Sequence, residues 1–136
     1  MLAAATGALT VTAAAWGVSD AMVEVASAAE VRSFVPDFAA IAAIPARGLI
    51  VTAPGDRPGV DFVSRCFFPA TGVPEDSVTG SAHTTLASWW APRLGRNALV
   101  GEQASARGGM VRVTLRGDRV TLAGHAITVA RGELLI

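Results

Sequence analysis

The chain has 136 residues, which is enough for one domain with a real core and too few for two large domains. Eleven arginines balance eleven acidic residues to a formal net charge of zero, so the basic surface expected of a protein that binds nucleic acid or an anionic membrane is missing. Lysine and tyrosine are absent from the sequence, which excludes a Schiff base, a lysine base and a phenol acid; we expect a small molecule or another protein as partner.

Residues 1–19 carry no charged side chain and consist mainly of Ala, Thr and Gly. They lack the basic start of a signal peptide and the Leu and Ile content of a membrane span, so the pattern does not favour export. We treat 1–19 as a separate amino-terminal segment that packs poorly, and 20–136 as the folded lobe. Cys66 is the single cysteine, so no intrachain disulfide can form; this favours a reducing compartment and a cytoplasmic protein.

Between residues 20 and 68 the apolar positions fall in short runs separated by Gly and Pro. Ser27 and Glu30 have the spacing of a capping box, which predicts a short helix over 28–34 that stops before Pro36. A second small helix is predicted over 36–44. The β-branched and aromatic runs predict three strands, over 20–27, 47–53 and 61–68.

The second half of the chain predicts one long helix and several strands. Residues 81–95 have helical length, with Arg93 near the end and Gly95 in the position of a C-terminal glycine. Apolar residues cover most of the circumference of this helix, which is typical of a helix buried on nearly all sides. Alternating apolar residues predict strands over 98–105, 109–115, 118–124 and 125–135. We therefore expect an α+β fold in which a mixed, largely antiparallel β-barrel wraps a central α-helix.

The stretch "EDSVTGSAH", residues 75–83, concentrates polar groups just before this helix. If Gly80 and Ser81 open the helix, the first backbone N–H groups have no partner in the helix and can hold a carboxylate. Gly80 lets a ligand approach the backbone, and Asp76 lies on the loop ahead, where its carboxylate can face the same ligand and pass a proton. A purely structural role stays open, because Asp, Ser and Thr before a helix are most often caps.

The remaining reactive side chains have simpler structural explanations. His83 lies in the first turn of a buried helix, where a histidine is more often a hydrogen-bonded core residue than a catalyst. His125 begins a predicted strand, and Cys66 lies within one beside Phe67, as a small buried hydrophobe would. We predict no metal site and no cofactor.

Two ordered motifs in this sequence resemble the phenazine-biosynthesis PhzF-like isomerase family, which is related in fold to diaminopimelate epimerase. They are E-D-x-V-T-G-S-A-H at residues 75–83 and Q-x-S-x-R-G-G at residues 103–109. The resemblance runs from about Asp20 to the end of the chain. It implies the carboxy-terminal lobe of a two-lobed protein, with a cofactor-free active site between the central helices of the two lobes.

The family resemblance implies proton-transfer isomerisation of a small carboxylate-bearing substrate. It assigns a catalytic role to Asp76 and substrate contacts to Gly80, Ser81, Thr79 and His83. The principal glutamate base of the family lies in a segment reading roughly N-x-S-E-T, which this sequence does not contain. The chain is therefore expected to need a second lobe or a homodimer partner. The alternatives are a non-catalytic carboxylate-binding module and an inactive truncated fragment.

Overall fold

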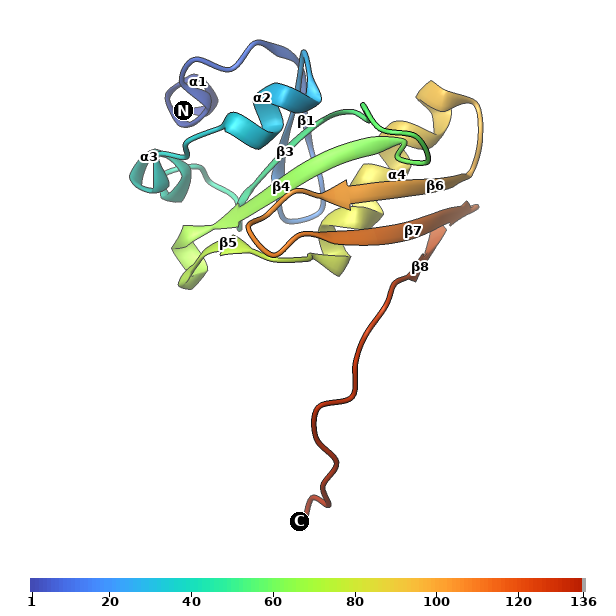
Figure 1. The fold of residues 1–136 in the computed structure, drawn as a ribbon. Helices are drawn as coiled ribbons and strands as arrows, with labels where there is room; N and C mark the ends of the chain where they lie inside the picture. Colours follow the sequence, from blue (N-terminus) through green and yellow to red (C-terminus); the bar gives the residue numbers. More distant parts are fainter. Residues whose placement is uncertain (136) are drawn as a thin grey trace.

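The computed structural model describes residues 1–135, which form one mixed sheet with helices on both of its faces (Figure 1). The helices are α1 (Leu2–Thr6), α2 (Ala28–Ser33), α3 (Phe38–Ala42) and α4 (Gly80–Leu94), and a 3-10 turn spans Pro69–Thr71. The strands are β1 (Val11–Trp16), β2 (Ala21–Val25), β3 (Leu49–Pro54), β4 (Phe62–Phe68), β5 (Val73–Asp76), β6 (Ala98–Gln103), β7 (Gly109–Arg116) and β8 (Arg119–Ala123).

The strands follow the order β1-β2-β3-β4-β6-β7-β8, and the short β5 pairs with β4 beside this path. Pairing is antiparallel except between β2 and β3 and between β4 and β6, which are parallel. Within residues 1–135 the outer edges of β1 and β8 have no partner, so the sheet is open. The predicted mixed and largely antiparallel α+β fold is confirmed, but the prediction of a closed barrel is wrong.

Helix α4 packs against one face of the sheet, and α2 and α3 cover the other. The core under α4 includes Phe62, Leu86 and Trp90, whereas the opposite core includes Val31, Ile41 and Phe67. α4 is buried along a single stripe and exposes Ser81, Thr84 and Ser88. The predicted burial on nearly all sides is therefore not confirmed, because polar residues recur at three- and four-residue intervals along its outer face.

Most predicted elements between residues 20 and 124 are confirmed, with shifts of a few residues at their ends. Ser27 caps α2 by accepting the N–H of Glu30 at 3.2 Å, as the capping-box spacing predicts. Residues 1–19, for which the sequence predicts no element, form α1 and β1, and Ala5 is buried.

The predicted strand over 125–135 pairs with nothing in the described structure. These residues extend away from the lobe (Figure 1) and every one of them is exposed. The longest helix of residues 1–135 has 15 residues, and none of the described helices has the length and apolar character needed to cross a bilayer.

Candidate functional site

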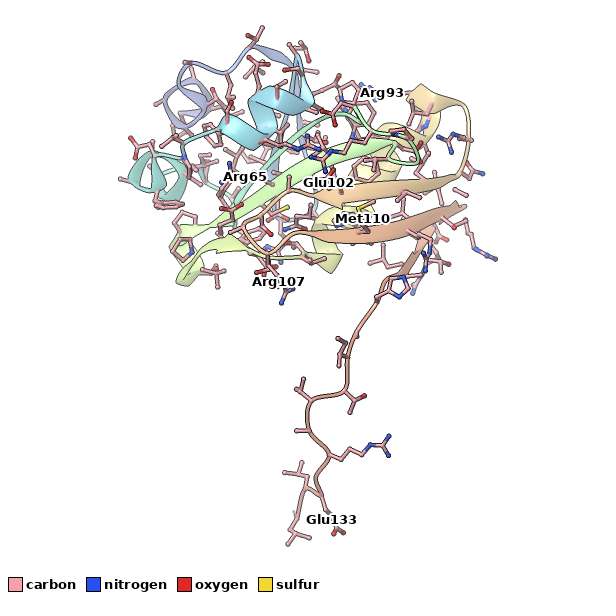
Figure 2. All side chains as sticks on the ribbon, in the orientation of Figure 1. Arg65, Arg93, Glu102, Arg107, Met110 and Glu133 are labelled. Atoms are coloured by element: carbon pink, nitrogen blue, oxygen red, sulfur yellow. The ribbon has the colours of Figure 1, made fainter. Side chains whose placement is uncertain are left out.

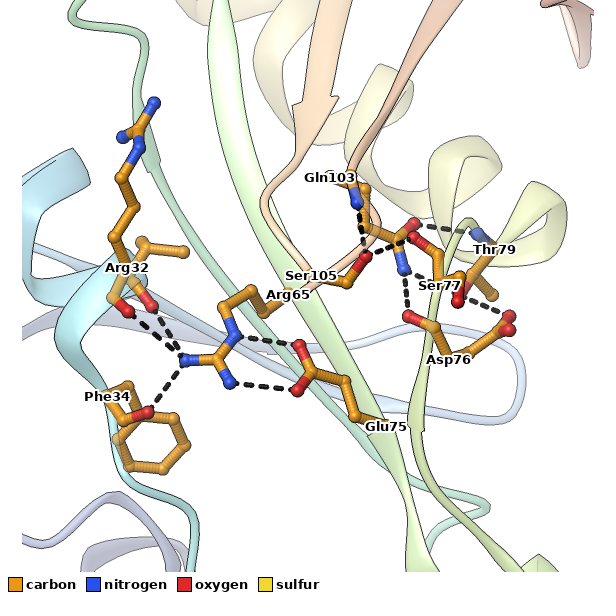
Figure 3. Close-up of polar contacts among 11 residues, drawn as sticks. Arg32, Phe34, Arg65, Glu75, Asp76, Ser77, Thr79, Gln103 and Ser105 are labelled. Atoms are coloured by element: carbon orange, nitrogen blue, oxygen red, sulfur yellow. Dashed lines mark hydrogen bonds and ion pairs between the residues drawn. The ribbon is translucent and has the colours of Figure 1, made fainter.

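Glu75 and Asp76, the two neighbouring acids of strand β5, have different surroundings (Figure 3). Glu75 forms a two-pronged ion pair with Arg65, with N–O distances of 2.8 and 2.9 Å. Arg65 also donates to the backbone carbonyl of Phe34 at 2.7 Å, which ties β5 to the end of α2. Because successive side chains of a strand point to opposite faces, Asp76 lies on the other side. Glu75 is thus held in an ion pair, whereas no described arginine pairs with Asp76.

Asp76 is half-buried at the end of β5, opposite Cys66 of β4. Its Oδ2 accepts a 2.8 Å hydrogen bond from the hydroxyl of Thr79. In the part of the chain that the structure describes, no hydrogen bond involves Oδ1. The carboxylate is therefore held by one oxygen and has the other available to a ligand.

Gln103, at the end of β6, holds the loop that carries Asp76. Its fully buried side chain donates from Nε2 to the backbone carbonyl of Asp76 at 2.8 Å and to the Thr79 hydroxyl at 3.0 Å. Its Oε1 accepts the backbone N–H of Thr79 at 2.7 Å. One side chain thus fixes both ends of the segment from Asp76 to Thr79, as Figure 3 shows.

The rest of the Q-x-S-x-R-G-G motif supports the same loop. The Ser105 hydroxyl donates to the backbone carbonyl of Ser77 at 2.7 Å and accepts the N–H of Gly108 at 3.1 Å. Gly109 leaves room for Val78, because a Cβ built on Gly109 would lie 2.2 Å from the Val78 Cγ2. Residues of the second motif therefore hold the loop of the first motif in place by hydrogen bonds and packing. This role was not predicted from the sequence.

Helix α4 begins at Gly80 with an open end. Thr79 is the N-cap residue, but its hydroxyl bonds Asp76 and makes no cap to the helix. Among residues 1–135, no side chain or loop carbonyl bonds the N–H of Gly80 or Ser81, and both residues are exposed. The partial positive charge of a 15-residue helix is thus presented beside Asp76, and in the described chain no side chain bonds the first N–H groups of the helix.

Arg47 adds a fixed donor at this end of the helix. It pairs with the buried Asp20 through two hydrogen bonds of 2.8 and 2.6 Å, and this contact raises the pKa of the Arg47 guanidinium. It also donates to the Ser81 hydroxyl oxygen at 2.9 Å. Because that oxygen accepts from Arg47, the hydroxyl proton of Ser81 is free to point toward a bound group.

His83 lies on α4 but its ring is fully buried and points into the core. Its Nδ1 is 2.7 Å from the backbone carbonyl of Thr79, and since a carbonyl only accepts, Nδ1 carries the proton. The ring packs beside Phe62, and Nε2 would be 3.2 Å from a Cβ placed on Gly101. Burial lowers the pKa of His83, so the ring is neutral at pH 7. The geometry favours a structural role for His83 over substrate contact.

Cys66 lies in the core beside this site, and its thiol is unreactive in the folded chain. The side chain is completely buried, and burial raises the pKa of the thiol to about 12. The thiolate needed for nucleophilic attack is therefore scarce at neutral pH. This agrees with its interpretation from sequence as a small buried hydrophobe.

The structure brings Asp76, Thr79, Gly80 and Ser81 together at one end of α4 and separates His83 from them by burying it. Arg47 and Gln103 were missed, because the residues they hold are 34 and 24 to 27 positions away in sequence. The Q-x-S-x-R-G-G motif was the available signal for Gln103. Arg47 gives no local sequence signal.

Comparisons with known proteins give relatives in both sequence and fold. An uncharacterized isomerase of Halalkalibacterium halodurans is 46% identical over 117 residues, which cover 86% of this chain and 44% of that protein. An uncharacterized isomerase of Pseudomonas aeruginosa is 55% identical over 104 residues, which cover 76% of this chain and 39% of that protein. A crystal structure of a PhzF family protein from Enterococcus faecalis superposes with a TM-score of 0.87 at 38% identity, covering 99% of this chain and 51% of that one.

The chain thus spans less than half the length of these two curated relatives. The family model described as "Phenazine biosynthesis-like protein" matches residues 1–132, including the segment 1–19 that the sequence analysis set apart. With the motifs at residues 75–83 and 103–109 joined in one site, these matches give one conclusion: this chain belongs to the PhzC-PhzF family of phenazine biosynthesis-like proteins.

Proposed function

We propose that this chain supplies one half of a cofactor-independent isomerase site that moves a proton on a small carboxylate-bearing substrate. The observation that carries the proposal is the position of Asp76, the last residue of β5, which has a free Oδ1 and precedes the open start of α4 by four residues. Relatives that carry the name isomerase support the reaction class. The proposed setting is the cytoplasm.

In the proposed site the start of α4 holds the carboxylate of the substrate. The free N–H groups of Gly80 and Ser81 donate to it, and the Ser81 hydroxyl adds a third donor because Arg47 occupies its oxygen. The positive helix end favours the anionic form of the ligand. The absence of a Cβ at Gly80 lets the ligand come close, since the nearest atom to a Cβ built there is the Leu122 Cδ1 at 3.7 Å.

Asp76 takes part in the proton transfer as one of two acids. A glutamate on a second lobe, as the family resemblance implies, removes a proton from a carbon of the substrate and the pair returns it at another carbon. The electron pair left at the first carbon forms a double bond, and the second carbon gives up a double bond as it takes the proton, so the net change is the position of one C–H bond and of one double bond and no oxidant or co-reactant is consumed. Thr79 donates to Oδ2 and thereby fixes the direction in which Oδ1 points. The second lobe is supplied by another polypeptide segment or by a homodimer partner.

A non-catalytic carboxylate-binding module is the second candidate function. It is favoured by the fact that, among the described residues around the start of α4, Asp76 is the one carboxylate without an arginine partner; Glu75 pairs with Arg65, and Asp20 pairs with Arg47. With a single acid the site holds an anion but has no second group to complete a proton shuttle. This function predicts saturable ligand binding and ligand-induced stabilisation without exchange.

Deuterium entry from solvent separates the two functions. The purified chain is incubated in D₂O with cyclic and amino-acid carboxylates, and loss of each C–H signal is followed by proton NMR. Asp76→Asn is the matched control, because the amide oxygen still accepts from Thr79 but cannot exchange a proton. We expect the substitution to lower the exchange rate by roughly 10²-fold or more. Measurable deuterium entry that is equal in both proteins would remove Asp76 from the mechanism, whereas saturable ligand binding with no entry in either protein would favour the binding module.

A further inference from the structure

Arg47 is held in one orientation beside the start of α4. Its Nε and Nη2 donate to the two carboxylate oxygens of Asp20 at 2.8 and 2.6 Å. The Asp20 side chain is only 5% exposed, and the guanidinium lies over the Phe68 ring, with its Cζ 4.9 Å from the ring centroid. A two-pronged bond to a buried carboxylate and contact with an aromatic ring leave the guanidinium little freedom to turn.

The hydrogen bonds of Arg47 leave one end of its guanidinium open. Nε and Nη2 share Asp20, so the N–H of Nη2 that donates to the Ser81 hydroxyl oxygen at 2.9 Å is the one at the end of the fork. Among the hydrogen bonds of residues 1–135, none involves Nη1. Because the side chain is 38% exposed, a ligand can reach this nitrogen.

The planar guanidinium fixes where the open N–H points. The end N–H groups of Nη1 and Nη2 run parallel, as they do when an arginine binds both oxygens of one carboxylate. Since the N–H of Nη2 points at the Ser81 oxygen, the N–H of Nη1 points at the space next to that oxygen. A ligand oxygen that accepts from the Ser81 hydroxyl lies about 2.7 Å from it, in that same space. One ligand oxygen can therefore accept from Ser81 and from Nη1 together.

The neighbouring acids of the chain are engaged elsewhere. Glu75 is held in its own ion pair, and Asp76 accepts from Thr79. Figure 2 shows Glu133 at the far end of the carboxy-terminal segment, away from the lobe. The open N–H of Arg47 is therefore met by water or by a ligand, and a carboxylate is the stronger acceptor because the bond is then assisted by charge.

We propose that Arg47 binds the substrate carboxylate directly and is a specificity-determining residue for an anion at the start of α4. The inference rests on the proposed function, which places that carboxylate at the N–H groups of Gly80 and Ser81. One carboxylate oxygen accepts from both the Ser81 hydroxyl and Nη1 of Arg47, while Nη2 holds the Ser81 oxygen. Asp20 acts as a positioning residue, because its two bonds set the plane of the fork.

The test is the dissociation constant of benzoate, measured from the amide signals of the ¹⁵N-labelled chain. Arg47→Lys keeps a cation beside Asp20 but has no fork to meet Asp20, Ser81 and the ligand together; we expect benzoate to bind roughly tenfold more weakly. Asp20→Asn combined with Arg47→Gln removes both charges, leaves no buried charge unpaired and should weaken binding as much. Arg93→Lys is the matched control: Arg93, labelled in Figure 2, lies in the last turn of α4, is 43% exposed and should leave the dissociation constant unchanged.

Ser81→Ala separates direct binding from an indirect effect of Arg47 through the Ser81 hydroxyl. The variant keeps the backbone N–H groups at the start of α4, so benzoate binding stays measurable. Direct binding predicts that Arg47→Lys weakens benzoate by roughly threefold or more in this background as well, whereas an indirect effect predicts no further change. Far-UV circular dichroism checks that each variant keeps its fold.

Two results would overturn the direct contact and leave the proposed function standing. One is equal benzoate affinity in Arg47→Lys and the unsubstituted chain, and the other is loss of the Arg47→Lys effect in the Ser81→Ala background. A lack of saturable benzoate binding in the unsubstituted chain would overturn both the contact and the proposed carboxylate site.

Discussion

Replacing Gln103 by Leu tests whether the second motif holds the segment from Asp76 to Thr79. The substitution keeps a similar volume but removes three hydrogen bonds, which join Gln103 to the N–H of Thr79, the hydroxyl of Thr79 and the carbonyl of Asp76. The Thr79 hydroxyl keeps its bond to Asp76, so two backbone groups are left without their partner.

The expected loss follows from the burial of those two groups. A buried polar group without a partner costs about 1–3 kcal/mol. Thr79 is buried, with an exposed fraction of 6%, whereas Asp76 is half-buried and its carbonyl can recover part of the loss from water. The free energy of unfolding should therefore fall by about 2–4 kcal/mol.

Urea unfolding followed by tryptophan fluorescence measures this loss. Gln103→Glu is the matched variant, since its side chain can still accept from Thr79 but puts a carboxylate into a fully buried site against the Asp76 carbonyl; we expect a loss at pH 7 at least as large as for Gln103→Leu. Arg112→Gln, at an exposed position on β7, controls for a change in the same hairpin. If Gln103→Leu unfolds at the same urea concentration as the unsubstituted chain, the three hydrogen bonds of Gln103 contribute nothing to the free energy of unfolding, which would contradict this prediction.

Three further predictions concern the packing and titration of the interior. Gly109→Ala should destabilise the fold by about 1–3 kcal/mol, because its Cβ would meet Val78, whereas Gly132→Ala, with no neighbour within 4 Å, should match the unsubstituted chain in thermal unfolding. Burial lowers the pKa of His83 below its unfolded value of about 6.5, so its contribution to stability is complete above that pH and is lost as the pH falls toward the folded pKa. For this one proton, the free energy of unfolding changes by at most about 1.4 kcal/mol per pH unit. His83→Gln should therefore flatten the plot of urea midpoint against pH between about pH 5 and 6.5. Parallel plots for the variant and the unsubstituted chain would contradict a neutral buried ring. Cys66, with its pKa raised to about 12 by burial, should resist a thiol reagent at pH 8 until urea unfolds the chain; rapid labelling of the native state would show an open core.

The grouping of Asp76, Thr79, Gly80 and Ser81 at one end of a helix could be predicted from sequence because these residues are neighbours along the chain. Gly80, four positions after Asp76, opens a helix in the structure as the motif spacing predicts. The contacts that hold the loop in place could not be derived in this way. Gln103 and Ser105 act on residues 24 to 28 positions earlier, and only the folded sheet brings β6 beside the end of β5.

The shape of the sheet was predicted less well, for a physical reason. Apolar alternation identifies strands but says nothing about whether the first and last strands meet. Ile127 and Val129, which follow β8, have the same alternation as Val111 and Val113 of β7, yet the first pair is exposed and the second is buried. β5 was missed because four residues containing Pro74 give too short a pattern.

The central claim is that the open start of α4 binds a carboxylate beside Asp76, and backbone amide NMR tests it most directly. Benzoate is titrated into the ¹⁵N-labelled chain, with benzamide as a neutral probe of the same shape. The account predicts saturable shifts of the Gly80 and Ser81 amide signals with benzoate and none with benzamide. Unchanged Gly80 and Ser81 signals with both probes, or equal shifts with both, would contradict it.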